Sequence, residues 1–425
     1  MSIAIFLAVL FSSMSIGVPI AFALMLTALA LMIQLDFFDA QLLAQNVQAG
    51  FDNFPLLAVP FFVLAGELMT AGGLSRRIVD LARVYFGHVR GGLGYVAIGA
   101  SVLLASMSGS AIADTAALAT LLLPMMRRQG YPLGSSGGLI ASGGIIGPII
   151  PPSMPFIIYG VTTNTSISQL FLAGIAPGIM MAVAIALAWG WIVRGKELPV
   201  EEKASWKERG RVMRRSIWAL LLPVIIVGGL RGGIFTPTEA AVVAAVYALI
   251  ITTLVYRELD LKGVYKVLID ASKTTSVVMF LAGAAMASSY MITLADLPRQ
   301  LIDLFEPVLG SPMLFMALVV LFLLVIGMVM DLTPAILILA PVLAPMAAAA
   351  GVHPVYFGLI FIMSGCIGLI TPPVGTVLNV VSGVGNMKME AVVRGVMPFI
   401  VAYFTLLALL ILFPQLVLWP LSWLS

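Results

Sequence analysis

Two short polar clusters stand inside long apolar stretches, and both offer oxygen atoms to a cation. The first cluster places Ser106, Ser108 and Ser110 around a glycine, and the second places Asp331 four residues after Gly327. Hard cations prefer oxygen ligands, and hydroxyl groups with few charges suit a weak, reversible site. The residue types therefore indicate binding of Na⁺ rather than covalent catalysis.

Each cluster is followed, further along the chain, by a proline-rich break in an apolar segment. The breaks are Gly147–Pro152, with the sequence GPIIPP, and Thr371–Pro373, with the sequence TPP. Proline interrupts a helix, so these breaks free main-chain carbonyl oxygens at membrane depth, where such groups require partners. Cluster and break together predict one Na⁺ site formed by Ser106, Ser108 and Ser110 with Gly147, Ile150 and Pro152. The matching positions of the second half predict a second site formed by Gly327, Asp331 and Thr333 with Gly368, Thr371 and Pro373.

The acidic residues at membrane depth have both functional and structural interpretations. An ionisable residue inside a membrane is a functional candidate, so Asp331 can neutralise a second Na⁺ or carry a coupling proton. The structural alternative is a carboxylate that caps a helix beginning at Thr333. We favour ion coupling for Asp331. For Asp114 and Glu67 we favour local hydrogen bonding, because Asp114 lies beyond the tip and Glu67 lies near the inner end of its span.

The composition excludes an ordinary soluble enzyme. Of 425 residues, 61% are apolar and 10% are charged, and the mean hydropathy is +1.12, whereas soluble proteins have about 25% charged residues. A net charge of +3 with two histidines offers no basic stripe to nucleic acid. The single cysteine, Cys366, excludes a disulfide framework and a thiolate metal cluster. No phosphate-loop or hydrolase motif occurs, so we predict an all-α polytopic protein of the lipid bilayer, without a cofactor or enzymatic activity.

The basic residues are bunched, and the bunching predicts the topology. Twenty of the 22 lysines and arginines fall in five places, at 76–90, 127–128, 194–215, 257–273 and 388–394. The positive-inside rule puts all five in the cytoplasm, which gives a cytoplasmic N-terminus and a periplasmic C-terminus. The apolar N-terminal segment lacks a basic start and a cleavage site, so we expect a retained span. The nine full spans are expected at 3–33, 54–72, 137–163, 170–193, 216–230, 237–256, 274–294, 354–386 and 393–418.

Two further apolar runs begin and end on the same side of the membrane, so they are predicted to be re-entrant hairpins. The first, 92–126, has its tip at Ser106–Ser110, and the second, 312–347, has its tip near Gly327–Asp331. Two amphipathic segments are expected to lie as arm helices, 75–90 on the inner surface and 296–308 on the outer surface.

The two halves of the sequence match at one constant offset, which is the separation between Gly144 and Gly365 and is called the repeat offset below. Gly144–Pro152 aligns with Gly365–Pro373 at six of nine identical positions, and the same offset aligns Ser110 with Asp331. The charge rule makes the first copy enter from inside and the second from outside, and inverted repeats with interrupted helices mark secondary transporters. The domains are expected at 1–193 (first repeat, with a broken helix at 137–163), 194–215 (charged cytoplasmic linker) and 216–425 (linking span and second repeat, with a broken helix at 354–386).

Four ordered motifs resemble one known family. They are SGSAIAD at 108–114, GIIGPIIPP at 144–152, RGGIFTPTEAA at 231–241 and GMVMDLTP at 327–334. Together they look like the large membrane subunit, of the DctM type, of tripartite ATP-independent periplasmic (TRAP) transporters. Within that family the chain looks closest to permeases of the 2,3-diketo-L-gulonate type, and the resemblance covers essentially the whole chain.

The resemblance implies an elevator fold of the ion-transporter superfamily in the bacterial inner membrane. It implies a transport domain of hairpins and broken helices that slides against a scaffold in contact with a small four-helix membrane subunit. A periplasmic substrate-binding protein is expected to deliver an organic acid (a sugar acid, keto acid or dicarboxylate), with Na⁺ symport driving uptake. The substrate is expected near Ser108, Ser153 and Asp331, between the two tips. Leu294 stands where some sialic-acid members have an arginine, which argues against that substrate.

Two other interpretations stay open on the sequence. A stand-alone Na⁺/dicarboxylate symporter of the same fold accounts for the same motifs without a binding protein. A membrane scaffold or a membrane-embedded enzyme is disfavoured, because a scaffold has no use for paired interruptions that expose backbone in lipid, and no nucleophile or metal cluster with acid–base partners is visible.

Overall fold

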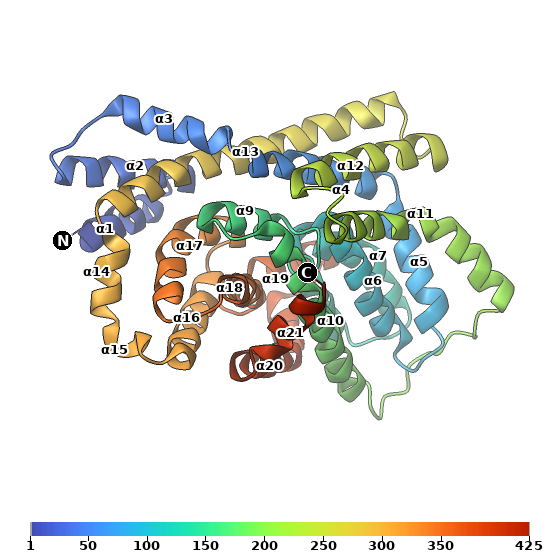
Figure 1. Ribbon diagram of the computed structural model, residues 1–425. Coiled ribbons are helices and arrows are strands. Elements are labelled where there is room, and N and C mark those ends of the chain that lie inside the picture. The colour runs from blue at the N-terminus through green and yellow to red at the C-terminus, as the bar shows by residue number, and fades with distance from the viewer. Residues whose placement is uncertain (1, 425) are drawn as a thin grey trace.

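The computed structural model describes residues 2–424, and every regular element in that range is a helix (Figure 1). The first half contains α1 (Ser2–Ser15), α2 (Ile20–Gln34), α3 (Ala40–Phe51), η1 (Phe54–Leu57), α4 (Ala58–Ala71), α5 (Leu74–Phe86), α6 (Gly92–Ser108), α7 (Ala111–Arg128), α8 (Leu133–Gly144), α9 (Met154–Thr163) and α10 (Ile167–Ile192). The second half contains α11 (Trp206–Arg231), α12 (Pro237–Ile250), η2 (Ile251–Val255), α13 (Leu261–Leu294), α14 (Leu297–Leu304), α15 (Glu306–Leu309), α16 (Pro312–Gly327), α17 (Leu332–Ala349), α18 (Pro354–Gly368), α19 (Thr376–Gly385), α20 (Met389–Leu412) and α21 (Gln415–Leu424).

The helix boundaries of the two halves follow the repeat offset seen in the sequence. Helix α7 starts at Ala111 and α17 at Leu332, and the two helices have the same length of 18 residues. The starts of α8 and α18 are likewise separated by the repeat offset, and α9 and α10 start within one residue of the positions that α19 and α20 predict. From the hairpins onward, the second half therefore repeats the order of the helices of the first, with their starts at nearly the same offset.

Both predicted hairpins and both predicted helix interruptions are present. Helices α6 and α7 form the first hairpin, whose tip turns at Gly109, with φ of 61°, a left-handed conformation that glycine adopts without a steric penalty. Ser110 then caps α7, because its Oγ accepts a hydrogen bond from the Ala113 amide. Helices α16 and α17 form the second hairpin. Residues 145–153 separate α8 from α9, and residues 369–375 separate α18 from α19.

The prediction of a single span over residues 3–33 is wrong. The chain turns between α1 and α2, and the two helices pack against each other. Gly17 adopts a left-handed φ of 83°, and Pro19 precedes the first residue of α2. Glycine permits that reversal and proline cannot continue α1, so the short Gly-Val-Pro sequence outweighs the continuous hydrophobicity around it.

Three other boundaries differ from the predicted ones. The charged linker is shorter than expected, because Ser205 caps α11 and the helix starts at Trp206 inside the basic segment. Helix α13 has 34 residues, and at 1.5 Å per residue it is about 51 Å long, well beyond a bilayer core of about 30 Å. The last span ends at Leu412, and the separate helix α21 after Pro414 packs against α10.

The helices are arranged in two groups (Figure 1). The long helix α13 runs along one side and packs against α2, α3 and α4, with α12 packed on α4. The hairpins, the interrupted helices, α10 and α20 form the second group. The arm helices α5 and α14 lie at opposite ends of the molecule in this view.

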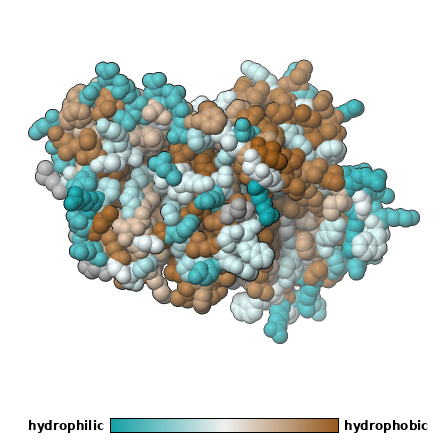
Figure 2. Space-filling model, viewed as in Figure 1, coloured by the Kyte–Doolittle hydropathy of each residue, from teal (hydrophilic) through white to brown (hydrophobic). Residues whose placement is uncertain are grey.

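The surface and the helix lengths fit a protein that crosses a membrane several times. Seven helices within residues 2–424 are long and apolar enough to span a bilayer, and many large apolar side chains are exposed. Figure 2 shows apolar side chains over much of one face, with hydrophilic side chains gathered mainly near its edges. Lipid tails cover such a surface, since exposed apolar area of this extent is rare in soluble proteins.

Candidate ion and substrate site

The tip of the first hairpin is organised around a serine–aspartate pair. Ser108 Oγ donates a hydrogen bond to Asp114 Oδ1 at 2.5 Å, and the Ser110 amide donates to Ser108 Oγ at 3.1 Å. Asp114 lies one turn into α7 and is 3% exposed. The local hydrogen bonding predicted for Asp114 is confirmed, and this bond draws the carboxylate toward the predicted ligands.

The first helix break lies directly against this tip. A Cβ added to Gly147 would stand 2.4 Å from Asp114 Oδ2, and one added to Gly109 would stand 2.6 Å from the Pro152 carbonyl oxygen. Only glycine permits these two approaches. The structure therefore brings Ser108, Gly147 and Pro152 together. Ile150 packs its side chain toward Gly178 of α10, so that only its main chain is available to the site.

Two oxygen atoms beside the first break have no hydrogen-bond partner among the described residues. They are Asp114 Oδ2 and Thr115 Oγ1, and both are buried. An unpaired polar atom buried in a protein is costly, and a carboxylate oxygen more so. The predicted ligand set omitted both residues. The six-residue spacing from Ser108 to Asp114 across a hairpin tip is the signal that could have pointed to Asp114.

The tip of the second hairpin also meets its helix break through backbone contact. A Cβ added to Gly327 would stand 2.9 Å from the Gly368 Cα atom. The Gly375 amide donates to the Met328 carbonyl at 3.1 Å, which ties the end of the break to the tip. Gly327 and Gly368 are therefore adjacent, as the predicted second site requires.

Asp331 occupies the N-cap position of α17 but does not cap it. Helix α17 begins at Leu332, one residue before the predicted start, and the Asp331 side chain makes no capping hydrogen bond. The carboxylate is half-buried. The purely structural interpretation of Asp331 thus loses the contact on which it depended.

The remaining predicted residues are held by bonds within their own segments. Thr371 Oγ1 donates to the Ile367 carbonyl at 2.7 Å. Ser153 is fully buried, caps α9, and donates from its hydroxyl to the Pro148 carbonyl at 2.5 Å. A substrate contact with the Ser153 hydroxyl therefore requires the first break to rearrange.

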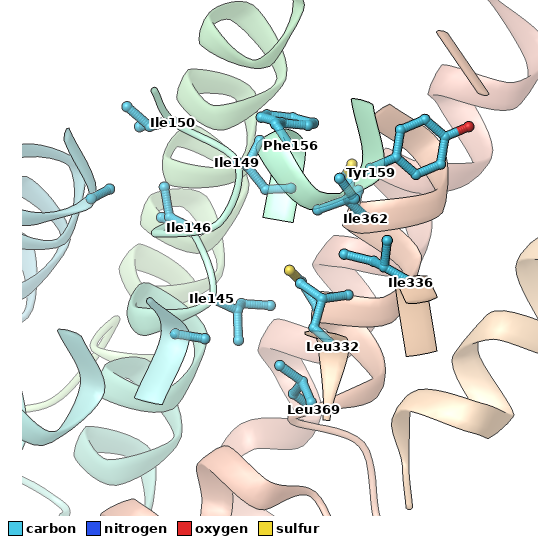
Figure 3. Close-up of a cluster of buried hydrophobic side chains, with 14 of the residues drawn as sticks. Ile145, Ile146, Ile149, Ile150, Phe156, Tyr159, Leu332, Ile336, Ile362 and Leu369 are labelled. Atoms are coloured by element: carbon cyan, nitrogen blue, oxygen red, sulfur yellow. The ribbon is translucent and has the colours of Figure 1, made fainter. Parts of the chain in front are cut away.

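An apolar cluster fills the space between the two breaks. Ile145 and Ile149 of the first break point toward side chains of α17 and α18, whereas Ile150 points away from them, as Figure 3 shows. Among them Leu332 is next to Asp331 in the chain. This packing keeps lipid and bulk water away from the freed backbone at membrane depth.

The chemistry of the donors suits a hard monovalent cation. Within residues 2–424, no group of three or more His, Cys, Asp or Glu side chains is arranged to hold a metal ion. The first tip instead offers hydroxyl, carbonyl and single carboxylate oxygens, the ligand types that hard cations prefer. Such a set matches a reversible Na⁺ site better than a transition-metal site.

Paired hairpins that meet paired helix breaks define a class of multi-pass membrane transporters. The family description "Tripartite ATP-independent periplasmic transporter, DctM component" matches residues 7–416. The chain therefore belongs to the DctM family of TRAP transporter large permeases, as the four sequence motifs predicted, and it is a transport protein rather than an enzyme.

Individual relatives and one solved structure agree with this assignment. The 2,3-diketo-L-gulonate TRAP transporter large permease protein YiaN of Escherichia coli is 53% identical over the full length of both chains. The sialic acid TRAP transporter large permease protein SiaM of Vibrio cholerae is 41% identical over 94% of this chain and 93% of that protein. The crystal structure of the Alcanivorax borkumensis YdaH transporter shares the fold with a TM-score of 0.66, at 17% identity, over 90% of this chain and 91% of that one.

Proposed function

We propose that this permease imports an organic acid by Na⁺ symport, together with a small four-helix membrane subunit and a periplasmic substrate-binding protein, in the bacterial inner membrane. The names of the relatives support an acid substrate, since 2,3-diketo-L-gulonate and sialic acid are both sugar acids. The word tripartite in the family description supports the two partner components. A sugar acid, keto acid or dicarboxylate is the substrate class.

The observation that carries Na⁺ coupling is the unpaired Asp114 Oδ2 beside Gly147. A cation at this position gains a carboxylate oxygen and removes the cost of an unpartnered buried charge. We assign the first Na⁺ to Ser108, Ser110, Asp114 and the carbonyls of Gly147, Ile150 and Pro152. The second Na⁺ is assigned to Asp331 and Thr371 with the backbone of Gly327, Gly368 and Pro373. The substrate carboxylate binds between the tips, near Ser108, Ser153 and Asp331.

The separate helix α1 completes a proposed inverted repeat. Helix α1 corresponds to the end of α11, and α2 corresponds to α12. Each half then has five crossings, and an odd number of crossings makes the second half start on the opposite side of the membrane. The extra crossing also reverses the side expected for the N-terminus. We therefore propose that both termini face the periplasm, with the basic segments still in the cytoplasm.

The two helix groups suggest an elevator movement. The group of hairpins and interrupted helices carries both proposed Na⁺ sites, while α13 and the helices packed on it form a frame longer than the bilayer is thick. In this proposal the first group slides along the frame and carries ions and substrate across the membrane. The arms α5 and α14 brace the frame at the two surfaces.

Uptake in proteoliposomes tests the function. The purified permease is reconstituted with its small subunit, and uptake of a radiolabelled acid is measured with the binding protein, with and without an inward Na⁺ gradient. We expect uptake only when the gradient and the binding protein are both present. Gradient-driven uptake by this chain alone would instead establish a stand-alone symporter, and uptake indifferent to Na⁺ would disprove the coupling.

Cysteine labelling from each side tests the inverted topology. Cysteines introduced at Arg83 on α5 and Gln300 on α14 are treated with a membrane-impermeant maleimide in sealed, oriented vesicles. The native Cys366 is buried and does not interfere. We expect position 300 to react from the periplasmic side and position 83 from the cytoplasmic side. Reaction of positions 83 and 300 from one side would overturn the inverted repeat.

A further inference from the structure

A polar pocket of about 360 Å³ lies between the two helix groups, away from both hairpin tips. It is bounded by the end of α9, the end of α13, the second half of α17 and the start of α18. Figure 1 shows α9 and α17 beside the same end of α13. In the proposed orientation α13 leads toward the periplasm, so this pocket opens on the side from which substrate arrives. Its lining residues with hydroxyl or amide side chains are Tyr159, Thr162, Thr163, Asn164, Thr165, Ser289 and Thr293.

Each threonine hydroxyl group in the pocket already donates its hydrogen bond to another group of the protein. Thr162 donates to the Ile158 carbonyl at 2.6 Å, and Thr293 donates to the Ser289 carbonyl at 2.9 Å. Thr163 donates to the Tyr159 carbonyl at 2.8 Å. The 2.8 Å contact between the Thr163 and Thr165 hydroxyls then leaves Thr165 as its donor, because a hydroxyl carries one hydrogen. All four hydroxyls can offer only lone pairs to a ligand.

Helix α17, which lines one side of the pocket, adds further hydrogen-bond acceptors. Pro341 and Pro345 both line the pocket. Proline has no N–H group, so Pro345 leaves the Pro341 carbonyl without its helical donor. None of the described residues that line the pocket is a lysine, an arginine or an acidic residue. Tyr159, Asn164 and Ser289 are the lining side chains that keep a hydrogen atom to donate, and they are outnumbered by acceptor groups, so the pocket accepts more hydrogen bonds than it gives.

A pocket with more acceptors than donors favours the hydroxyl groups of a sugar acid over its carboxylate. A carboxylate has only acceptors and finds few donors here, whereas an alcohol hydroxyl donates as well as accepts. We propose that the pocket is a subsite for the polyhydroxyl chain of an incoming sugar acid, occupied before the carboxylate reaches the hairpin tips. The inference rests on the proposed function and adds a preference for polyhydroxylated acids. Both 2,3-diketo-L-gulonate and sialic acid, named for two relatives, combine a carboxylate with several hydroxyls.

Protection of an introduced cysteine tests the subsite without any transport. Ser289→Cys is made in the full-length permease in lipid nanodiscs, and its rate of reaction with N-ethylmaleimide is measured. D-Gluconate and D-sorbitol are expected to slow the reaction about tenfold at ten times their Kd, by simple occupancy. Succinate, which has the carboxylates but no hydroxyl, is expected to leave the rate unchanged. Asn164→Cys provides a second reporter if Ser289→Cys does not fold.

A double variant shows whether the threonine acceptors cause the protection. Thr163→Val with Thr293→Val keeps the shape of the side chains and removes two acceptors, so protection by D-gluconate and D-sorbitol is expected to disappear. Thr405→Val is the matched control, because its hydroxyl also bonds to a carbonyl of its own helix but lies in the apolar groove between α10 and α20. Equal protection by succinate, no protection by either polyol, or protection that survives the double variant would overturn the proposal. Because no Na⁺ gradient is used, protection without Na⁺-driven uptake would contradict the proposed function alone.

Discussion

The nine residues of the first break, 145–153, are all buried, whereas Pro373 and Val374 of the second break are exposed. The hairpin tips that face these breaks differ in the same way, because the acidic residue at the first tip is more deeply buried than the one at the second. Asp114 at the first tip is 3% exposed and bonded to Ser108, while Asp331 at the second tip is half-buried and makes no capping bond. Two copies of one sequence template thus form one closed tip and one partly open tip.

The difference comes from the position of the acid in each copy. The repeat offset aligns Asp331 with Ser110, and it aligns Asp114 with Ala335. The first acid therefore lies one turn inside its helix, against the break, and the second lies at the end of its helix. A closed site with an unpaired carboxylate holds an ion tightly, whereas water can reach an open one. We infer that the first site binds Na⁺ more tightly and that the second responds more directly to substrate.

The largest effect is expected from filling the closed site. In Gly147→Ala the added Cβ would stand 2.4 Å from Asp114 Oδ2, so the proposed ion position would be blocked. We expect Na⁺-driven uptake to fall by about tenfold or more, equivalent to at least about 1.4 kcal/mol. Gly383→Ala on α19 is the matched control, because nothing lies within 4 Å of its added Cβ. Normal uptake by a folded Gly147→Ala variant would rule out the first site.

Neutralising the two acids separately tests which site is tighter. Asp114→Asn is expected to raise the Na⁺ concentration for half-maximal uptake by about tenfold, since it removes a carboxylate from a desolvated site. Asp331→Asn is expected to lower uptake as well, but to raise the Na⁺ concentration for half-maximal uptake only about threefold, because solvent screens the charge of this carboxylate. Both variants should reach the membrane in normal amounts. An equal rise of the half-maximal Na⁺ concentration in both variants, or a larger rise in Asp331→Asn, would contradict the inference that the first site binds Na⁺ more tightly.

A smaller effect is expected from removing one hydroxyl at each tip. Ser108→Ala deletes the donor to Asp114 Oδ1 and is expected to lower Na⁺-dependent uptake about fivefold, as for loss of a hydrogen bond worth about 1 kcal/mol. Thr371→Val is expected to lower it about twofold, because that hydroxyl is already bonded to the Ile367 carbonyl. Uptake rates at low Na⁺ measure both. The prediction fails if Thr371→Val is the more damaging of the two.

The smallest effect is expected from the arm helices α5 and α14, which differ between the halves in their ion pairs. Arg83 on α5 forms an ion pair with Glu201 of the linker at 2.7 Å, whereas the described side chains of α14 form no ion pair. The hydrogen bond from Arg83 lowers the pKa of Glu201 below its usual value of 4.5. A lowered pKa stabilises the fold above the unfolded-state value, and this stabilisation is lost as the pH falls through the folded-state value.

Both side chains of the pair are partly exposed to solvent, which screens the charges, so the contribution of the pair is at most about 1 kcal/mol. We expect the thermal midpoint of the wild type to drop by a small extra amount between pH 6 and pH 3, compared with Glu201→Gln, when both are measured in nanodiscs. Arg299→Gln on α14 serves as the control in the other arm and should not alter the pH dependence. Identical pH profiles for wild type and Glu201→Gln would show that the linker contact is not stabilising.

Much of the fold could be predicted from local sequence. A hydrophobic run bounded by basic residues predicted the first hairpin, and a run without basic flanks predicted the second. Pro-Pro sequences predicted the breaks, because proline acts on the backbone within a few residues. The same reasoning failed at residues 3–33, where a single Gly-Val-Pro turn divides a continuous apolar run into α1 and α2. Hydropathy averages over such a turn, so only the packing of α1 on α2 revealed it.

Composition, proline placement and the repeat offset were enough to predict a helical membrane protein with two matched halves and oxygen-rich tips, because each of these features can be read along the chain. Which oxygen atoms lie next to one another depends instead on how the helices pack. Asp114 approaches Gly147 because α7 packs beside the break that follows α8, a separate segment of the chain. Contacts of that kind depend on how helices pack, and helix packing depends on side-chain shape across segments that no local pattern connects.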